Sequence, residues 1–265
     1  MKRGIGSALF GVTPLGLVVG VSAFIALTGT ASPTRLDPRL SWCSPSSAHW
    51  LGCGEGGVDL LALLARAELG GVALAVSVAL FGFVVGTPLG ASAALARGRF
   101  ERAVARTADL IQAFPTFLFA LVVLSAVRSP NRLHLGLVFA ATAWAPFARL
   151  ALAQTRVLRD ATFLEAAAAL GVGRVRVVLR HLVPHLLGVV AVQLGATGSA
   201  IVVSEAALAF VGLGPRDGVS LGAVMDQGVA AMLRAPHVLV VGAVSIFLTS
   251  VSLLLAGRAV ESPAP

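Results

Sequence analysis

The chain has 265 residues, of which 57% are hydrophobic and only 12% are charged. Soluble globular proteins carry about 25% charged residues, so this composition cannot cover the surface of a water-soluble fold. The net charge of +8 does not indicate nucleic-acid binding, because the arginines are spread between apolar runs instead of forming one basic domain. We therefore predict an all-α integral membrane protein that lies in a lipid bilayer and has no nucleic-acid partner.

The first apolar run extends from about residue 4 to residue 31, behind Lys2 and Arg3. Small residues at its end would suit signal-peptide cleavage, which is one interpretation of the run. It is much longer than the apolar core of a signal peptide, which has about 7–15 residues. We therefore predict that residues 1–30 form a retained first transmembrane helix.

Residues 31–68 are rich in Pro, Ser and Gly and form the predicted extracytoplasmic segment. It contains both cysteines of the chain, Cys43 and Cys53, which can form a disulfide outside the cytoplasm. Two free thiols are the alternative that the sequence leaves open. His49 lies between the cysteines, but three ligands lack the fourth that a structural zinc site needs. No metal site is predicted.

Further apolar runs predict five more spans, which together make a five-helix permease core at 69–257 and leave a cytoplasmic tail at 258–265. The spans are expected at 69–96, 107–127, 135–155, 186–211 and 236–256. Several helix-breaking residues lie inside these spans: Pro88, Pro115, Pro146, Gly82, Gly86 and Gly90. They favour close helix packing or they act as hinges, and the sequence leaves both interpretations open.

The positions of the basic residues predict the orientation. Lysine and arginine total 20, and 13 of them fall on the side that holds both predicted termini. Loops with more lysine and arginine face the cytoplasm. Both termini are therefore predicted to be cytoplasmic, as is the polar stretch between the fourth and fifth spans.

That polar stretch, residues 160–185, reads as a helix-turn-helix. Thr162 and Glu165 have the spacing of a capping box, which predicts a helix start at Thr162. Gly171 and Gly173 permit a sharp bend, and Pro184 is expected to start a helix. We predict two short helices joined by a glycine turn, lying flat on the cytoplasmic side.

Several motifs of the chain resemble those of a known family. Glu165-Ala166-Ala167, followed by Gly171 and Pro184, resembles the EAA loop of ABC importer permeases. Other matching pieces occur in the expected order: His49–Gly52, Ala113–Thr116 and Ser204–Gly214. Together they are similar to the dipeptide/oligopeptide/nickel permease family, in its C-type branch of second permease subunits.

The resemblance implies a type I ABC importer permease fold with six transmembrane helices and a cytoplasmic coupling loop. It also implies four kinds of partner: two cytoplasmic ATP-binding subunits, a second homologous permease, an extracytoplasmic solute-binding protein and the lipid of a bacterial plasma (inner) membrane. The residues implied in coupling to the ATPase are Glu165, Ala166, Ala167, Gly171, Arg174 and Pro184.

The chain itself is not expected to be an enzyme. A P-loop needs a lysine after its glycines, and Lys2 is the only lysine. ATP is therefore expected to be bound by the partner subunits, and no cofactor is expected on this chain. The chain departs from the family pattern in its outer segment, at Cys53, Gly54 and Val58. These departures leave open what that segment does here.

Candidates for the translocation pathway or gate are Glu205, Gln193 and Gln112. Glu205 is the one acid that the predicted spans place deep in the membrane, where a lipid-facing charge costs about 3 kcal/mol. A structural hydrogen bond to a neighbouring span is its alternative role.

The predicted function is the permease subunit of an ATP-driven, binding-protein-dependent importer for peptides or a related small solute such as nickel. The rival function is a stand-alone ion-coupled transporter or channel that uses Glu205. An intramembrane hydrolase would need paired catalytic groups at one depth, and the sequence offers none. The sequence does not choose the substrate.

Overall fold

A computed structural model describes residues 2–28 and 36–259; the side chains of residues 2–11, Glu165 and Ala168 are outside the description. Residues 260–265 of the predicted tail, residues 31–35 of the predicted outer segment and residues 29–30 of the predicted first span lie outside it.

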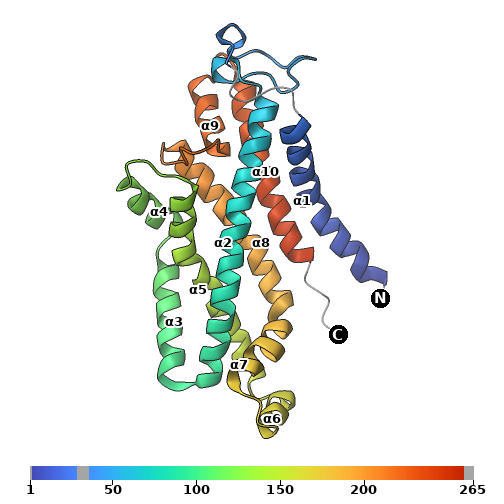
Figure 1. Cartoon of the computed structure of the whole chain (residues 1–265), viewed down its shortest axis with the longest axis vertical. Helices are drawn as coiled ribbons and strands as arrows, with labels where there is room; N and C mark the ends of the chain where they lie inside the picture. Colours follow the sequence, from blue (N-terminus) through green and yellow to red (C-terminus); the bar gives the residue numbers. More distant parts are fainter. Residues whose placement is uncertain (1, 29–35, 260–265) are drawn as a thin grey trace.

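The described chain is a bundle of long helices (Figure 1). Its α-helices are α1 (Lys2–Thr28), α2 (Leu60–Ala96), α3 (Gly98–Ala113), α4 (Thr116–Ser125), α5 (Arg132–Leu158), α6 (Thr162–Ala169), α7 (Arg174–Val177), α8 (Val183–Phe210), α9 (Leu221–Ala230) and α10 (Pro236–Ala259). Short turns are η1 (Pro38–Leu40), η2 (Glu55–Gly57) and the π-helical η3 (Val178–Leu182). We call the end that holds residues 36–59 and α9 the loop end, and the end that holds α6 the hook end (Figure 1).

The helix lengths confirm an all-α membrane fold. Four stretches are long and apolar enough to cross a bilayer: 60–96, 132–158, 174–210 and 236–259. A fifth crossing results if α3 and α4 are counted as one bent span. Of α1, residues Val12–Thr28 form a shorter apolar helix. The described residues thus support four or five of the six predicted crossings by length and composition.

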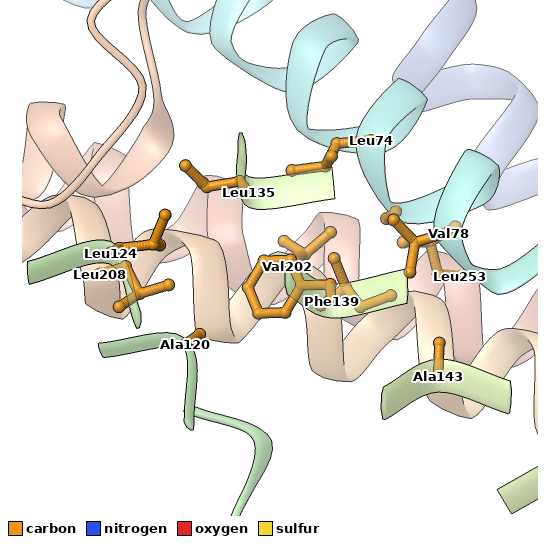
Figure 2. Packing of buried hydrophobic residues seen from close by; sticks show 12 residues of the cluster. Leu74, Val78, Ala120, Leu124, Leu135, Phe139, Ala143, Val202, Leu208 and Leu253 are labelled. Atoms are coloured by element: carbon orange, nitrogen blue, oxygen red, sulfur yellow. The ribbon is translucent and has the colours of Figure 1, made fainter. Parts of the chain in front are cut away.

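The main core lies where α2, α4, α5, α8 and α10 meet (Figure 2). Phe139 of α5 is 1% exposed and lies among Val78 of α2, Val202 of α8 and Leu253 of α10. Leu124 of α4 and Leu208 of α8 close the loop-end side of the cluster. Since side chains from five helices interlock here, these helices hold one another in a fixed arrangement.

A close helix contact joins α2 to α5 through glycines spaced four residues apart. A Cβ atom placed on Gly86 would lie 2.2 Å from the Trp144 carbonyl oxygen, and one on Gly90 would lie 2.0 Å from that of Ala148. Any side chain at these positions would force the backbones apart. The interpretation of these glycines as residues for close packing is therefore supported by direct geometry.

The third span was predicted as one helix at 107–127, and this is wrong. The chain forms α3 from Gly98 and then bends by 73° before α4. Phe114 is extended, with φ −94° and ψ 126°, because a residue before proline avoids the α-helical region. Pro115 therefore separates two helices here, whereas α2 and α5 continue through Pro88 and Pro146.

The second half of the predicted helix-turn-helix is also different. From Arg174 the chain is helical without interruption to Phe210, so α7, η3 and α8 form one long span and the predicted start at residue 186 is wrong. Pro184 lies just after η3. A π-helical turn is wider than an α-helical one, which relieves the clash between the proline ring and the preceding carbonyl. The hook and the membrane span are therefore one element.

Two further features differ from the predicted spans. The second membrane helix begins at Leu60, well before the expected residue 69, because Asp59 accepts a hydrogen bond from the Ala62 amide and caps the helix. The loop that was expected after the fifth span contains α9, whose first turn is capped by Ser220. In both cases a polar capping residue precedes an apolar turn.

Replacing Gly90 by alanine should destabilise the protein. Helix propensity alone would favour alanine, but the new methyl group would overlap the Ala148 carbonyl, and overpacking costs about 1–3 kcal/mol. The measurement is the unfolding temperature of the detergent-purified protein.

The matched control is Gly188→Ala in α8, where no atom lies within 4 Å of an added Cβ. The control should unfold at or above the wild-type temperature. Equal unfolding temperatures for Gly90→Ala and the control would contradict the close α2–α5 contact.

Candidate functional site

The hook consists of α6, a glycine turn, α7 and η3. Gly171 has φ +71°, a left-handed conformation that favours glycine, and the Val172 amide donates to the Ala167 carbonyl at 3.0 Å. This bond is the one that closes a helix in a Schellman motif. Gly173 has φ −63°, which any residue can adopt. The bend therefore depends on Gly171 and not on Gly173.

One face of the hook is packed firmly against the bundle. Its buried residues are Leu164, Ala167, Val177, Val178 and Leu182, none of them more than 8% exposed. They form a cluster with Ala91 of α2, Phe147 of α5 and Leu186 of α8. Because the hook shares a core with three membrane helices, it cannot move independently of them.

The other face of the hook exposes large apolar side chains. Leu170 is 82% exposed, Val175 73% and Leu179 55%. Arg174, Arg176 and Arg180 are exposed beside them. A patch that combines exposed aliphatic side chains with arginines is typical of a surface that binds another protein.

The predicted coupling residues occupy different places in this hook. Ala166 is exposed and Ala167 is buried, while Arg174 and Pro184 are exposed. The side chain of Glu165 lies outside the description, so the capping box with Thr162 stays a prediction. Pro184 lines a shallow cavity of about 450 Å³ together with Phe163, Arg180, His181 and His185.

A cavity of about 390 Å³ lies between the α3–α4 bend, α5 and α8, and we call it the polar cavity because hydrogen-bonding side chains line it beside a larger apolar surface. Phe114, Pro115 and Pro146 form part of its wall. Its hydrogen-bonding side chains are amides and hydroxyls: Gln112, Thr116, Thr142, Gln193, Thr197 and Ser204. The bend at Phe114–Pro115 thus opens onto the polar space of the bundle, where freed backbone groups are tolerated.

Two of the three pathway candidates line this cavity. Gln193 donates to the Thr197 hydroxyl at 3.0 Å, and Gln112 donates to the Ala108 carbonyl at 3.2 Å. Sequence reasoning missed Thr142 and Thr197, which are hydroxyl residues inside otherwise apolar runs.

Glu205, the third candidate, lies elsewhere. It is 3% exposed and does not line the cavity, although the adjacent Ser204 does. A Cβ atom added to Gly71 of α2 would lie 3.1 Å from its Oε2 atom, so the carboxyl group lies against the α2 backbone. The positive charge of Arg132 acts on it. Its Oε1 atom is buried without a hydrogen-bond partner among the described residues, so the structural hydrogen bond predicted as its alternative role is not present.

Arg132 connects the loops of the loop end. Its backbone amide donates to the Asp217 carboxylate at 3.1 Å, and its Nη2 donates to the Val219 carbonyl at 2.9 Å. The Arg216 amide donates to the Pro130 carbonyl at 2.9 Å. Asp217 therefore places a negative charge at the N-terminus of α5, where it is stabilising. The loop after α8 is held to the start of α5 by these bonds.

A second acid, Glu68, was missed by the sequence prediction of a single deep acid. Glu68 of α2 accepts a hydrogen bond from the Ser22 hydroxyl of α1, and Thr249 of α10 also bonds to it. Because polar groups inside a membrane need partners, this cluster ties α1 and α10 to α2. The prediction placed Glu68 outside the span, since it assumed that the helix began at residue 69.

The segment before α2 is closed by a disulfide between Cys43 and Cys53, with the two Cα atoms 4.8 Å apart. His49 lies with them in a group whose candidate ligand atoms are within 4.8 Å of one another. In the disulfide the sulfurs are not thiolate ligands. His49 Nδ1 instead pairs with Asp59 at 2.8 Å. Two of the residues that depart from the family pattern are buried: Cys53 lies in the disulfide, and Val58 packs in an apolar cluster with Leu60 and Leu64.

Comparison with known proteins decides the family. Residues 86–261 match the family described as binding-protein-dependent transport system inner membrane component. This range includes α3 to α8, and with them the hook and the polar cavity. The chain belongs to this family.

Curated relatives agree with this assignment. The glutathione transport system permease protein GsiD of Pectobacterium atrosepticum is 30% identical over 214 residues, which cover 80% of this chain and 71% of the relative. The oligopeptide transport system permease protein OppC of Haemophilus influenzae is 31% identical over 205 residues, covering 76% of this chain and 65% of the relative. GsiD of Escherichia coli O157:H7 is 32% identical over 217 residues, which cover 80% of this chain and 70% of the relative.

These comparisons confirm the family resemblance that the sequence motifs predicted. The chain is a membrane permease subunit of a binding-protein-dependent transport system, with the type I importer permease fold. The hook lies in the family's matched region, with α6 between the apolar stretches 132–158 and 174–210 and α7 at the start of the second.

Replacing Asp217 by alanine should destabilise the loop end of the permease. The variant loses the carboxylate that accepts the Arg132 amide at the start of α5, and loss of such a cap costs about 1 kcal/mol. The measurement is the unfolding temperature in detergent at low and high salt.

Asp226→Ala in α9 is the matched control, because this exposed acid has no ion pair or hydrogen bond among those of the described residues. The wild-type advantage over Asp217→Ala should shrink as salt screens the interaction. An Asp217→Ala protein as stable as the control would exclude the capping role.

Proposed function

We propose that the permease is the C-type second permease subunit of an ATP-driven importer in a bacterial plasma membrane. The hook end faces the cytoplasm, as do both termini. The observation that carries the proposal is the two-faced hook: one face is packed into the bundle, and the other exposes Leu170, Val175 and three arginines.

The exposed face of the hook is the docking surface for a cytoplasmic ATPase. Figure 1 shows α6 at the far end of the bundle, beyond the end of α10, which supports a position outside the hydrocarbon layer. Arginines there agree with a cytoplasmic position. The subunits that dock bind and hydrolyse ATP, so this chain needs neither a cofactor nor a catalytic site.

Movement of the hook is transmitted to the membrane helices by covalent continuity and by packing. α7 continues through η3 into α8, so a force on the exposed face acts directly on a membrane span. The buried face carries the same force to α2 and α5. Closure of two ATPase subunits on nucleotide would bias the bundle between two arrangements, one open to each side.

The polar cavity is the part of the translocation pathway that this subunit contributes. Amide and hydroxyl groups can hydrogen-bond the peptide groups of a substrate without favouring one sign of charge. Relatives of the permease are named for glutathione and oligopeptide transport. We therefore propose a peptide or a related small solute as the substrate, delivered by an extracytoplasmic binding protein, with a second homologous permease closing the pathway.

The rival proposal, a stand-alone transporter that uses Glu205, has less support. Glu205 is buried against α2 and is apart from the polar cavity. A transport acid would be expected to face a water-filled space.

Gly171→Val should uncouple ATP hydrolysis from uptake. Valine at φ +71° is strained, so the turn would change shape and alter how the hook meets the ATPase. Uptake into vesicles that contain the complete importer should fall about tenfold, while ATP hydrolysis continues.

Gly173→Ala is the control for this variant. Gly173 has an ordinary φ of −63° and nothing within 4 Å of an added Cβ, so the control should transport like the wild type. Normal uptake by Gly171→Val would refute the role of the turn. Failure of any ATPase to bind the wild-type permease would refute the proposed function itself.

Gln193→Leu should raise the substrate concentration needed for half-maximal uptake, because it removes a hydrogen-bonding group from the cavity wall. Gln154→Leu is the matched control, since Gln154 of α5 does not line this cavity. Both variants should unfold at similar temperatures. An unchanged concentration dependence for Gln193→Leu would place the pathway elsewhere.

A further inference from the structure

The helix α3 differs from the membrane spans around it. Its sequence mixes charged and apolar residues, with Val104 and Ala108 buried and most charges exposed. Val104 packs with Ala148 and Leu152 of α5. In Figure 1, α3 runs alongside α5 over the hook half of the bundle. It is an amphipathic helix whose apolar face lies on α5.

Two ion pairs fix α3 against α5. Arg156 Nε lies 2.6 Å from Glu101 Oε1, and Arg149 pairs with Asp109. The pairs are about two turns apart on each helix and run in opposite order, so the helices are antiparallel and cannot slide without breaking both pairs. Glu101 is only 9% exposed, so its charge would be left buried and unpaired if Arg156 moved away.

A third ion pair connects the start of α3 to the root of the hook. Arg97 Nη2 lies 2.9 Å from Asp160 Oδ1. Arg97 forms the corner between α2 and α3 with a φ of 55°, and Asp160 lies just before α6. The residue just before α3 is therefore paired with a residue two positions before the hook.

The other end of α3 forms part of the polar cavity. Ile111 and Gln112 line it, followed by the bend at Phe114 and Pro115. α3 thus joins the hook to the cavity wall along a path separate from α8. At the cavity, α3 ends in the sharp bend that leads to α4. Among the described residues, this is the one pair of consecutive apolar helices joined by such a bend.

We propose that Glu101 and Arg156 are positioning residues that make α3 a second lever for transport. The Asp109–Arg149 and Arg97–Asp160 pairs complete the connection. Displacement of the hook moves α5 and α3 together, and the bend at Phe114–Pro115 converts that movement into a change of the cavity wall at Gln112. This inference rests on the proposed function of the hook.

Uptake and ATP hydrolysis by charge variants test the lever. In the complete importer reconstituted in vesicles, Arg156→Glu should lower uptake about tenfold while ATP hydrolysis continues. The exchange Glu101→Arg with Arg156→Glu should restore most of the uptake. Because Glu101 is buried, a second exchange is made at the exposed pair, Asp109→Arg with Arg149→Asp, and it should restore uptake relative to Asp109→Arg alone.

Arg106→Glu provides the matched control on α3. This exposed arginine has no ion pair among those of the described residues, and its reversal changes the net charge equally. The control should retain uptake. Uptake by Arg156→Glu equal to that of the control overturns the proposal, as does failure of both exchanges to restore uptake.

The accessibility of the cavity wall can be measured directly with the variant Gln112→Cys. The native cysteines are joined in a disulfide, so this thiol can be labelled selectively with a maleimide. Labelling should change when a non-hydrolysable nucleotide is bound by the complex, and Arg156→Glu should abolish that change. An equal nucleotide response with and without Arg156→Glu overturns the lever. A wild-type importer without ATP-dependent uptake would instead refute the proposed function.

Discussion

The contact between α2 and α5 is the constraint on which the other arrangements depend. Gly82, Gly86 and Gly90 bring the α2 backbone against carbonyl groups of α5, so the two backbones lie close together over about two turns. Both helices continue to the hook end, where the hook packs against their side chains. The hook therefore has a rigid base, and a force applied to it reaches the centre of the bundle without being absorbed by a loose contact.

Proline has different consequences in this framework because its surroundings differ. Pro88 and Pro146 remain inside continuous helices that neighbouring helices cover. Pro184 follows a π-helical turn, which keeps α8 continuous with the hook. Of these four prolines, Pro115 alone separates two helices, and it does so beside the polar cavity. Sequence predicts that each proline frees a backbone carbonyl, but the response depends on what lies next to it.

Much of the fold and of the hook could be predicted from the sequence. Long apolar runs predict the spans, and the spacing of Glu165, Gly171 and Pro184 identifies the region that the family comparison supports. The ends of the helices were harder to predict, because a hydropathy profile does not detect helix-capping residues. Asp59 starts α2 earlier than the apolar run indicates, and this shift brings Glu68 into the helix, where it joins α1 and α10. The ion pairs of α3 join residues 40 or more positions apart, so periodicity could not reveal them.

The distribution of charge explains why the ends and the middle of the bundle can behave differently. At the loop end, Arg132 and Asp217 fasten the start of α5. At the hook end, Glu101–Arg156 and Arg97–Asp160 fasten α3 and the hook. The cavity between them is lined by amides, hydroxyls and apolar groups, with the Phe114–Pro115 bend in its wall. Charged pairs hold geometry over a distance, whereas neutral hydrogen-bonding groups exchange partners at little cost. Such a division lets the two ends remain ordered while the wall of the cavity changes shape.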